Sequence, residues 1–322
     1  MNGSIMMDDM PGNTPMNNSK SPDINGMGKL NTLYGRLDAL GCKGRDWSLL
    51  VFAGDHGVSL EGSSNYKALR SGQIVAAHLN GTSPTKKLLE RLGKREWIFD
   101  LGLCDEIDNP DLIQKRIRKG TRNFINEDAM DYGEALSALE AGRAVWEYVK
   151  LHNYDMVGLG EIGIGNTLSA SALGAAALQL PVELMTGPGS GGGALIARKI
   201  ELLRRAMDND PPEPNDVLDM LARFGGLEIA ALTGFISEAE HYGIPIILDG
   251  FVTSVAALLA VMLNNKSLPN LFCPSLALEP GHRLVMERLQ IEPWFDLELN
   301  YGEGLAAVMG MFMAEMTMSF YQ

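Results

Sequence analysis

Two glutamates in this sequence of 322 residues have neighbours that suit a carboxylate to chemistry. Glu161 lies within the glycine-rich segment GLGEIGIGNT, where backbone amides and the start of a helix of small residues would surround it. A carboxylate in such a place can hydrogen-bond ribose hydroxyls or stabilise a developing positive charge. Glu303 lies between two glycines, just before a strongly apolar segment. Burial and the helix dipole would act on its ionisation in opposite directions, and either outcome allows it to serve as a general base.

Two other segments have the composition of an anion site. Asn166 and Thr167 are types that commonly cap helices, so the turn beside them would expose amide N–H groups and the positive end of a helix dipole. The segment TGPGSGGG, residues 186–193, precedes a predicted helix that carries Lys199 in its first turns. Amides and one ammonium there could bind a phosphate. A flexible loop would also explain this run of glycines, and both interpretations stay open.

Polar residues follow two further apolar runs. Asp55 and His56 come directly after residues 47–53, and Asp249 comes after residues 243–248. Ligands of open α/β sheets gather at the carboxyl ends of strands, which is where these side chains would lie. His56 has no second His or Cys at ligand spacing, so we predict no metal site and expect it to position a loop or a substrate.

The glycines around Glu161 also allow a different class of function. Gly158, Gly160 and Gly163 have the spacing G-x-G-x-x-G, and Glu183 follows about 20 residues later, as in a dinucleotide-binding fingerprint. This pattern would indicate an NAD-dependent dehydrogenase, although Glu161 within the turn would repel a pyrophosphate. A third interpretation is that the glycines only permit a helix to pack closely on a sheet.

Strand and helix signals alternate along the chain, which predicts a parallel α/β sheet with one cleft. The final predicted helix is rich in methionine, which is more typical of a core or a subunit interface than of a cofactor site. The predicted strands cover residues 47–53, 96–101, 156–159 and 243–248, and the predicted helices cover residues 30–40, 69–92 with a break near 81–84, 132–151, 194–207, 227–242 and 305–320.

Composition limits the other possibilities. A net charge of −13 and a pI near 4.9 argue against nucleic-acid or anionic-membrane binding. No apolar run approaches the roughly 18 to 20 residues of a membrane span. The three cysteines, Cys42, Cys104 and Cys273, are far apart and indicate neither a disulfide framework nor a zinc site. Residues 1–28 read as a flexible polar tail without a secretory signal, so we expect a cytoplasmic protein.

The motifs, taken in order, resemble those of the nicotinate-nucleotide:dimethylbenzimidazole phosphoribosyltransferases, which make the lower-ligand nucleotide of cobamides. The resemblance covers about residues 29–320 and rests on GRLDAL (35–40), FAGDHGV (52–58), GEIGIGNT (160–167), FGGLEIAALTGFI (224–236), LDGF (248–251), LEPGH (278–282) and YGEG (301–304). We therefore expect a parallel Rossmann-like sheet flanked by helices in one domain, residues 29–322. A large α/β part would cover about 46–283, and a small helical part about 29–45 and 284–322.

This resemblance implies transfer of the phosphoribosyl group of nicotinate mononucleotide to an aromatic base, with inversion at C1′ and without a cofactor. It implies that Glu303 is the base toward the acceptor and that Glu161 lies near the ribose and the cationic centre. Lys199 and the glycine segment would hold the 5′-phosphate, and Asp249 would support the floor of the cleft. The implied substrate-binding residues are Asp55, His56, Gly163, Asn166, Thr167, Gly187, Gly189, Ser190, Gly191, Lys199, Asp249, Glu279 and Gly302.

The sequence also departs from the family pattern. The segment before Glu279 reads PSLAL where the family commonly has SHxSA, and the loop after FAGDHGV shows SSNY at residues 63–66. The resemblance implies a homodimer whose sites are completed by the partner. The departures leave two alternatives, a subunit of a heterodimeric enzyme that acts on phenolic bases, and a non-catalytic partner of a paralogous chain.

Overall fold

A parallel sheet forms the centre of the computed structural model, which describes residues 24–209 and 211–321. Its six strands lie in the order β3-β2-β1-β4-β5-β6, and every neighbouring pair is parallel. The strands are β1 (Trp47–Gly54), β2 (Arg95–Gly102), β3 (Leu112–Gln114), β4 (Met156–Ile162), β5 (Ile246–Ile247) and β6 (Leu271–Phe272). The order reverses between β1 and β4, as in Rossmann-type sheets, so the predicted fold class is confirmed.

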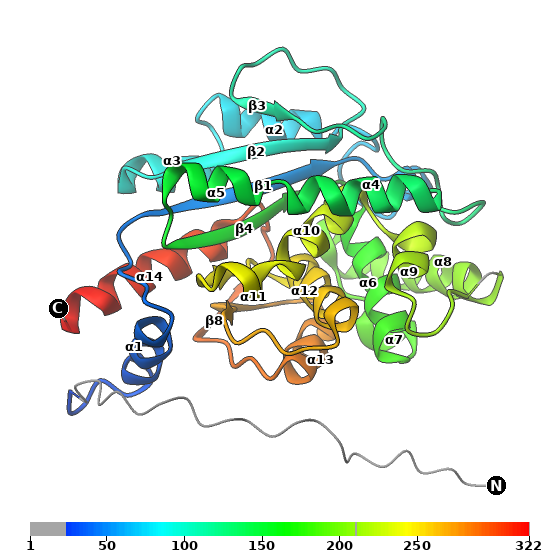
Figure 1. Ribbon diagram of the computed structural model, residues 1–322. Helices are drawn as coiled ribbons and strands as arrows, with labels where there is room; N and C mark the ends of the chain where they lie inside the picture. The colour runs from blue at the N-terminus through cyan, green and yellow to red at the C-terminus, as the bar shows by residue number, and fades with distance from the viewer. Residues whose placement is uncertain (1–23, 210, 322) are drawn as a thin grey trace, which may run out of the picture.

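Helices cover both faces of this sheet, and a short second sheet pairs β7 (Ser275–Ala277) with β8 (Phe295–Leu299) (Figure 1). The α-helices are α1 (Lys29–Ala39), α2 (Gly72–Leu79), α3 (Pro84–Leu92), α4 (Tyr132–Arg143), α5 (Trp146–His152), α6 (Asn166–Leu178), α7 (Val182–Met185), α8 (Ile196–Asn209), α9 (Val217–Phe224), α10 (Leu227–Ser237), α11 (Ala239–Tyr242), α12 (Phe251–Asn264), α13 (Pro280–Leu289) and α14 (Leu305–Tyr321). Short 3₁₀ helices are η1 (Gly57–Glu61), η2 (Gly189–Gly191) and η3 (Gly193–Leu195).

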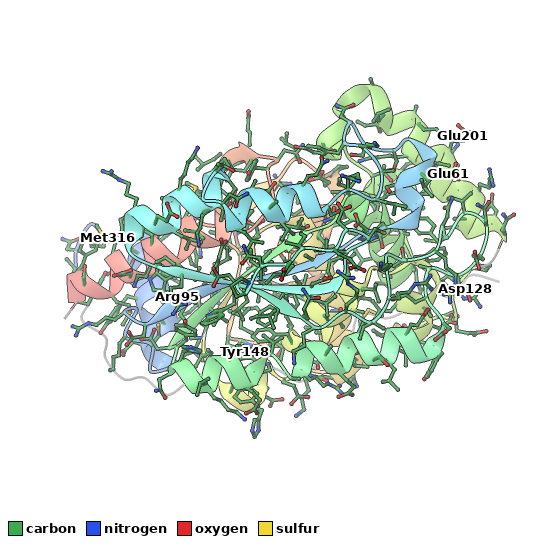
Figure 2. All side chains as sticks on the ribbon, turned by 90° about the horizontal axis from the view of Figure 1, so that it is seen from above. Glu61, Arg95, Asp128, Tyr148, Glu201 and Met316 are labelled. Carbon is green, nitrogen blue, oxygen red and sulfur yellow. The ribbon has the colours of Figure 1, made fainter. Side chains whose placement is uncertain are left out.

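Strand β1 is buried along its whole length because it contributes to a hydrophobic core on each face. Leu50 and Phe52 belong to the core shared with α4, α10 and α12, whereas Leu49 and Val51 belong to the core shared with α1 and α14. This alternation follows from the two-residue period of a strand. Figure 2 shows α5 with Tyr148 on one side of the sheet and α14 with Met316 on the other.

Strand β4 extends further than predicted, through Ile162, and it contains two glycines that we expected in the turn. Helix α14 and the segment before it lie against these glycines. A Cβ atom on Gly158 would lie 2.4 Å from Cε of Met311, and one on Gly160 would lie 2.9 Å from Cα of Gly304. The glycines therefore permit close packing of α14 on the strand, as the third interpretation held, and they do not form a dinucleotide-binding turn.

Several helix boundaries also differ from the prediction. The helix expected over residues 132–151 is divided into α4 and α5, and the one over residues 227–242 into α10 and α11. Helix α6 begins after Gly165, which is its N-cap with φ of 102°, so neither Asn166 nor Thr167 caps it. The break predicted near residues 81–84 is present between α2 and α3.

The two ends of the described chain meet at α1 and α14, which pack together with Tyr34 and Tyr321 stacked at 4.0 Å between ring centroids. Helix α14 also packs on β4, so it joins this helical pair to the sheet. Most of the predicted polar tail, residues 1–23, lies outside the described residues. Over 24–209 and 211–321, no helix combines the length and apolar character that crossing a membrane requires.

Candidate active site

A cavity of about 450 Å³ lies at the carboxyl ends of β4 and β5 and the start of α14. Both catalytic candidates, Glu161 and Glu303, line it, although 141 positions separate them. The cavity is also lined by the predicted binding residues Gly163, Asn166, Thr167, Gly189, Ser190, Asp249, Glu279 and Gly302. The structure thus gathers most of the predicted site around a single space.

The backbone around Glu303 is held in an uncommon conformation. Gly302, Glu303 and Gly304 are all left-handed, with φ of 76°, 58° and 78°. Glycine adopts this conformation freely, but glutamate does so at a cost of about 1 kcal/mol or more. The motif therefore needs its two glycines to turn the carboxylate of Glu303 into the cavity ahead of α14.

Asp249 fastens this turn to the sheet. Its carboxylate accepts the N–H groups of Gly304 at 3.1 Å, Ala306 at 2.8 Å and Ala307 at 3.2 Å, so it caps α14 from outside the helix. Burial raises the pKa of Asp249, the three amides oppose this rise, and the resulting value is about 6. Asp249 thus supports the cavity floor, as expected, by holding the segment that carries Glu303.

Glu161 is at the end of β4 and is 9 % exposed. The side-chain amide of Asn166 donates to its Oε2. Burial, followed by the nearby carboxylates of Asp249, Glu228 and Glu303, raises the pKa of Glu161 well above its usual range, and the Asn166 hydrogen bond only partly offsets this. A positive charge in the cavity would favour the ionised form of Glu161.

Glu303 has two hydrogen-bond partners at its Oε2 atom. Nε2 of His78, on α2, lies 3.0 Å away, and the hydroxyl of Tyr301 donates from 2.7 Å. Burial and then the hydrogen bond to Glu303 raise the pKa of the Tyr301 phenol, so it stays protonated as a donor. We did not predict His78, because a lone histidine in the apolar helix QIVAAHL has no sequence signal of function.

The opposite end of the cavity contains hydroxyl, amide and ammonium groups. Nζ of Lys199 lies 3.2 Å from Oγ1 of Thr167 and donates to the carbonyl of Gly187 at 3.3 Å. Lys199 is 2 % exposed and lies behind the lining, and burial lowers its pKa. The amide of Gly189 donates to Oε1 of Glu279 at 3.1 Å. An anion bound here would meet Thr167 first, with Lys199 directly behind it.

Comparison with known proteins identifies the family of this chain. The sequence matches the phosphoribosyltransferase family DBI_PRT over residues 16–322. Relatives named nicotinate-nucleotide–dimethylbenzimidazole phosphoribosyltransferase cover most of the chain. The chain belongs to this phosphoribosyltransferase family. The expectation raised by its sequence motifs is therefore confirmed at the level of the family.

Two curated relatives and two solved structures illustrate the similarity. The relative from Geobacter sulfurreducens is 34% identical over 303 residues, which are 92% of this chain and 86% of the relative. That from Roseiflexus sp. RS-1 is 38% identical over 266 residues, or 82% and 75% of the two chains. CobT from Thermus thermophilus has a TM-score of 0.86 at 33% identity over 94% of this chain and 92% of its own. A second structure, titled as the phosphoribosyltransferase of that organism, has a TM-score of 0.83 at 34% identity over 92% and 90%.

Two motifs of this phosphoribosyltransferase family prove to be scaffold around the cavity. Asp55 accepts the amides of Ser71 at 3.0 Å and Cys104 at 2.8 Å, and it does not line the cavity. Nε2 of His56 lies 2.6 Å from Oε1 of Glu228, in the FGGLE segment, and both side chains are fully buried. We predicted substrate contact for Asp55 and His56, and the structure instead gives them partners within the fold.

The remaining predicted residues of the glycine segment lie at the edge of the site. Gly187 is buried beside Glu279, where a Cβ atom would lie 2.7 Å from Cα of Glu279, and it is outside the lining. Gly191 is the last residue of η2. Glu183, the acid of the dinucleotide pattern, is on α7 and pairs with Arg204 away from the cavity.

Two loops of this phosphoribosyltransferase contact η2, and the sequence marked the first only as a departure from the family pattern at residues 63–66. Oγ of Ser64 lies 2.8 Å from Oγ of Ser190, whose carbonyl accepts the side-chain amide of Asn65 at 3.0 Å. The Asn300 side chain donates to the carbonyl of Gly189 at 2.7 Å. Ser63, Tyr66, Ile74 and Tyr301 also line the cavity. Tyr301 belongs to the YGEG motif of Glu303, whereas nothing in the sequence fixed the distance of Ser63, Tyr66 or Ile74 from Glu303.

Proposed function

We propose that this chain transfers the 5-phosphoribosyl group of nicotinate mononucleotide to a benzimidazole-type base, giving an α-ribotide and nicotinate for cobamide synthesis. The observation that carries the proposal is that Glu161 and Glu303 line one cavity in a chain that belongs to this family. The names of the Geobacter and Roseiflexus relatives specify the same donor and acceptor.

The proposed reaction breaks one bond at C1′, forms another there and transfers one proton. The bond between C1′ and the pyridinium nitrogen breaks, and its electron pair stays on that nitrogen, which leaves as neutral-ring nicotinate. A ring nitrogen of the base forms the new bond to the opposite face of C1′. The acceptor loses its N–H proton, and Glu303 takes it. The leaving ring is already cationic, so its departure needs no proton.

We propose that Glu161 stabilises the positive charge that develops on the ribose. Burial and the neighbouring carboxylates raise its pKa well above the usual range, which favours its neutral form. A cationic ring or an oxocarbenium-like C1′ nearby would favour its ionised form, so the attraction would grow as the bond breaks. Such a response places the stabilisation in the transition state rather than in the bound substrate.

The 5′-phosphate is proposed to bind at the end of the cavity that contains Thr167, Gly189 and Ser190. The ammonium of Lys199 lies behind Thr167 and would partly neutralise the phosphate through it. Glu279 accepts the amide of Gly189, so a phosphate would have to share or displace that contact. In this proposal the walls of the site are supported by Asp55, His56 and Gly187.

A product assay tests the proposal. The purified chain would be incubated with nicotinate mononucleotide and, separately, dimethylbenzimidazole, a purine and a phenol, and α-ribotides would be detected by mass spectrometry. We expect product with dimethylbenzimidazole. Product only with phenols, or only after addition of a paralogous chain, would replace the proposal by the heterodimeric alternative, which the relatives' names do not favour. No product under any of these conditions would refute transferase activity.

We further propose that the enzyme is a dimer in the cytoplasm. Helix α14 exposes Phe312, Met316 and Phe320, which repeat every four residues and form one apolar stripe. A second copy, or a paralogue, could cover it. The three cysteines are free, as is usual in a reducing compartment. Light scattering of the purified chain would give a dimer mass, and a monomer mass would contradict this assignment.

A further inference from the structure

A buried row of charged side chains leads from the surface to Glu303. Nδ1 of His78 lies 2.9 Å from Oε2 of Glu96, and its Nε2 lies 3.0 Å from Oε2 of Glu303. Nζ of Lys86, on α3, lies 3.4 Å from Oε1 of Glu96. The side chain of His78 is fully buried, that of Glu96 is 3% exposed and that of Glu303 is 12% exposed. This row of side chains thus joins α3, β2 and α2 to the turn before α14.

This arrangement makes His78 a cation. Burial by itself would lower the pKa of the imidazole, but the hydrogen bonds to Glu303 and Glu96 raise it to about 9. Near neutral pH the ring therefore carries a proton on both nitrogens, and each N–H group donates to a carboxylate. The charges alternate in sign from Lys86 through Glu96 and His78 to Glu303.

The contacts of Glu303 are all on one side of its carboxylate. Within the described part of the chain, its hydrogen bonds, from His78 and from Tyr301, both end at Oε2. Its other oxygen, Oε1, is the one left to receive a proton from a molecule in the cavity. The left-handed backbone at Glu303 and the Asp249 cap hold this orientation from the main-chain side.

We propose that His78, oriented by Glu96, is a positioning residue that pairs with the carboxylate of Glu303 and directs its Oε1 atom toward the acceptor. This inference rests on the proposed function, in which Glu303 receives the proton of the acceptor. His78 does not touch the reacting atoms; it acts only through the carboxylate of Glu303.

The need for such a cation follows from the other charges that face Glu303. Asp249 and Glu161 line the same cavity, and both oppose its ionisation when they are charged. Tyr301 contributes a neutral donor only, and Lys86 is separated from Glu303 by Glu96 and His78. Among the described residues His78 is therefore the cation in direct contact with Glu303, and its removal would take away the opposite charge that favours the carboxylate form.

The decisive variant replaces the pair as a whole, His78→Phe with Glu96→Met. Removing His78 alone would leave Glu96 buried without a partner and could unfold the chain, whereas an apolar pair of similar volume fills the same space. We expect the acidic limb of the profile of kcat/KM against pH to move upward by about one unit or more. On that limb the rate at a fixed pH would fall about tenfold for each unit of the shift and recover toward wild type at higher pH, with the KM for nicotinate mononucleotide changed less than about twofold.

Two further variants separate charge from packing. His78→Gln keeps one N–H donor but cannot carry a charge, so its acidic limb should move as in the double variant. His152→Phe is the matched control, since His152 bonds the carbonyl of Tyr148 at 2.8 Å and lies outside the cavity lining. Its profile should equal that of wild type. An unmoved profile in the folded double variant, or an equal loss of rate at every pH, would overturn the inference.

A readout without catalysis makes the two proposals distinguishable. Ring nitrogen signals in ¹H–¹⁵N spectra, assigned with His78→Gln, should show His78 as an imidazolium at pH 7. In Glu303→Gln the His78 titration should move to lower pH, because the coupling between the two groups is reciprocal. A neutral His78 at pH 7 would reject the positioning role even in an active enzyme. An intact imidazolium in an enzyme that forms no ribotide would reject the proposed function, and with it the role of His78 in catalysis.

Discussion

His56 and His78 are both fully buried histidines beside a glutamate, yet they belong to different kinds of site. Glu228, the partner of His56, is fully buried, so this pair is closed within the fold between β1 and α10. Glu303, the partner of His78, lines the cavity at the start of α14. A buried histidine–carboxylate pair is thus not in itself functional. What distinguishes the two is whether the carboxylate has an oxygen open to a substrate.

The ends of neighbouring strands repeat this contrast. Asp55 follows β1 and satisfies two loop amides, whereas Glu161 ends β4 and faces the cavity beside Asn166. Both are polar residues at the carboxyl end of a central parallel strand, where sheets of this type bind ligands. The difference is that both oxygens of Asp55 accept backbone amides, so it stabilises the wall of the site.

The largest expected effect is that of Glu303→Gln. The variant keeps the volume but removes the proton acceptor, so kcat should fall about a thousandfold while the KM for nicotinate mononucleotide changes little. Steady-state kinetics would measure this, and circular dichroism would check that the variant is folded. Tyr301→Phe, which loses one hydrogen bond to the same carboxylate, should cost at most about tenfold. Equal losses in kcat and in affinity would indicate that Glu303 has a structural role and is not the proton acceptor.

His56→Ala should act in the opposite way. It leaves the buried carboxylate of Glu228 without its partner, so the free energy of unfolding should fall by about 3 kcal/mol or more. Urea unfolding followed by circular dichroism measures the loss. The double variant His56→Leu with Glu228→Leu should recover most of it. Wild-type stability combined with lost activity would show that His56 contacts substrate after all.

Asp55→Ala should have a smaller effect on stability, about 2 kcal/mol, because the amides of Ser71 and Cys104 lose their acceptor. Asp55→Asn should lose less, since its amide oxygen can still accept one of them. Turnover per folded molecule should stay close to wild type in both variants. The comparison of the two strand ends would fail if Asp55→Asn lowered kcat as strongly as Glu161→Gln.

The most gradual expected effect is a dependence of stability on pH at His78. Its pKa is raised from 6.5 to about 9 in the folded chain, so between these values the folded state holds a proton that the unfolded state has released. The stabilisation of the folded state by this proton is complete below pH 6.5. It is lost as the pH rises through about 9, by at most about 1.4 kcal/mol per pH unit. Urea unfolding at pH 7, 8 and 9 should show a shallower slope for the variant with both His78→Phe and Glu96→Met. Parallel slopes would indicate an ordinary pKa for His78.

Several parts of the site could be recognised from the sequence because their neighbouring residues form a pattern. These are Glu161, Glu303, Asp249 and the glycine segment before Lys199. An acid between glycines, an acid after an apolar strand and glycines before a helix are patterns of adjacent residues. The α/β class followed in the same way from alternating strand and helix signals. The ordered motifs added the family, whose membership the relatives then confirmed.

Only the tertiary structure decided which of the polar residues share the cavity and which are sealed behind it. Asp55 and His56 carry the same local signal as Glu161, but Ser71, Cys104 and Glu228 occupy their polar atoms from other parts of the chain. His78 has no local signal, and it meets Glu303 across 225 positions. Hydrogen bonds between such distant residues depend on how helices and strands pack, and a linear pattern of residue types contains no measure of that distance.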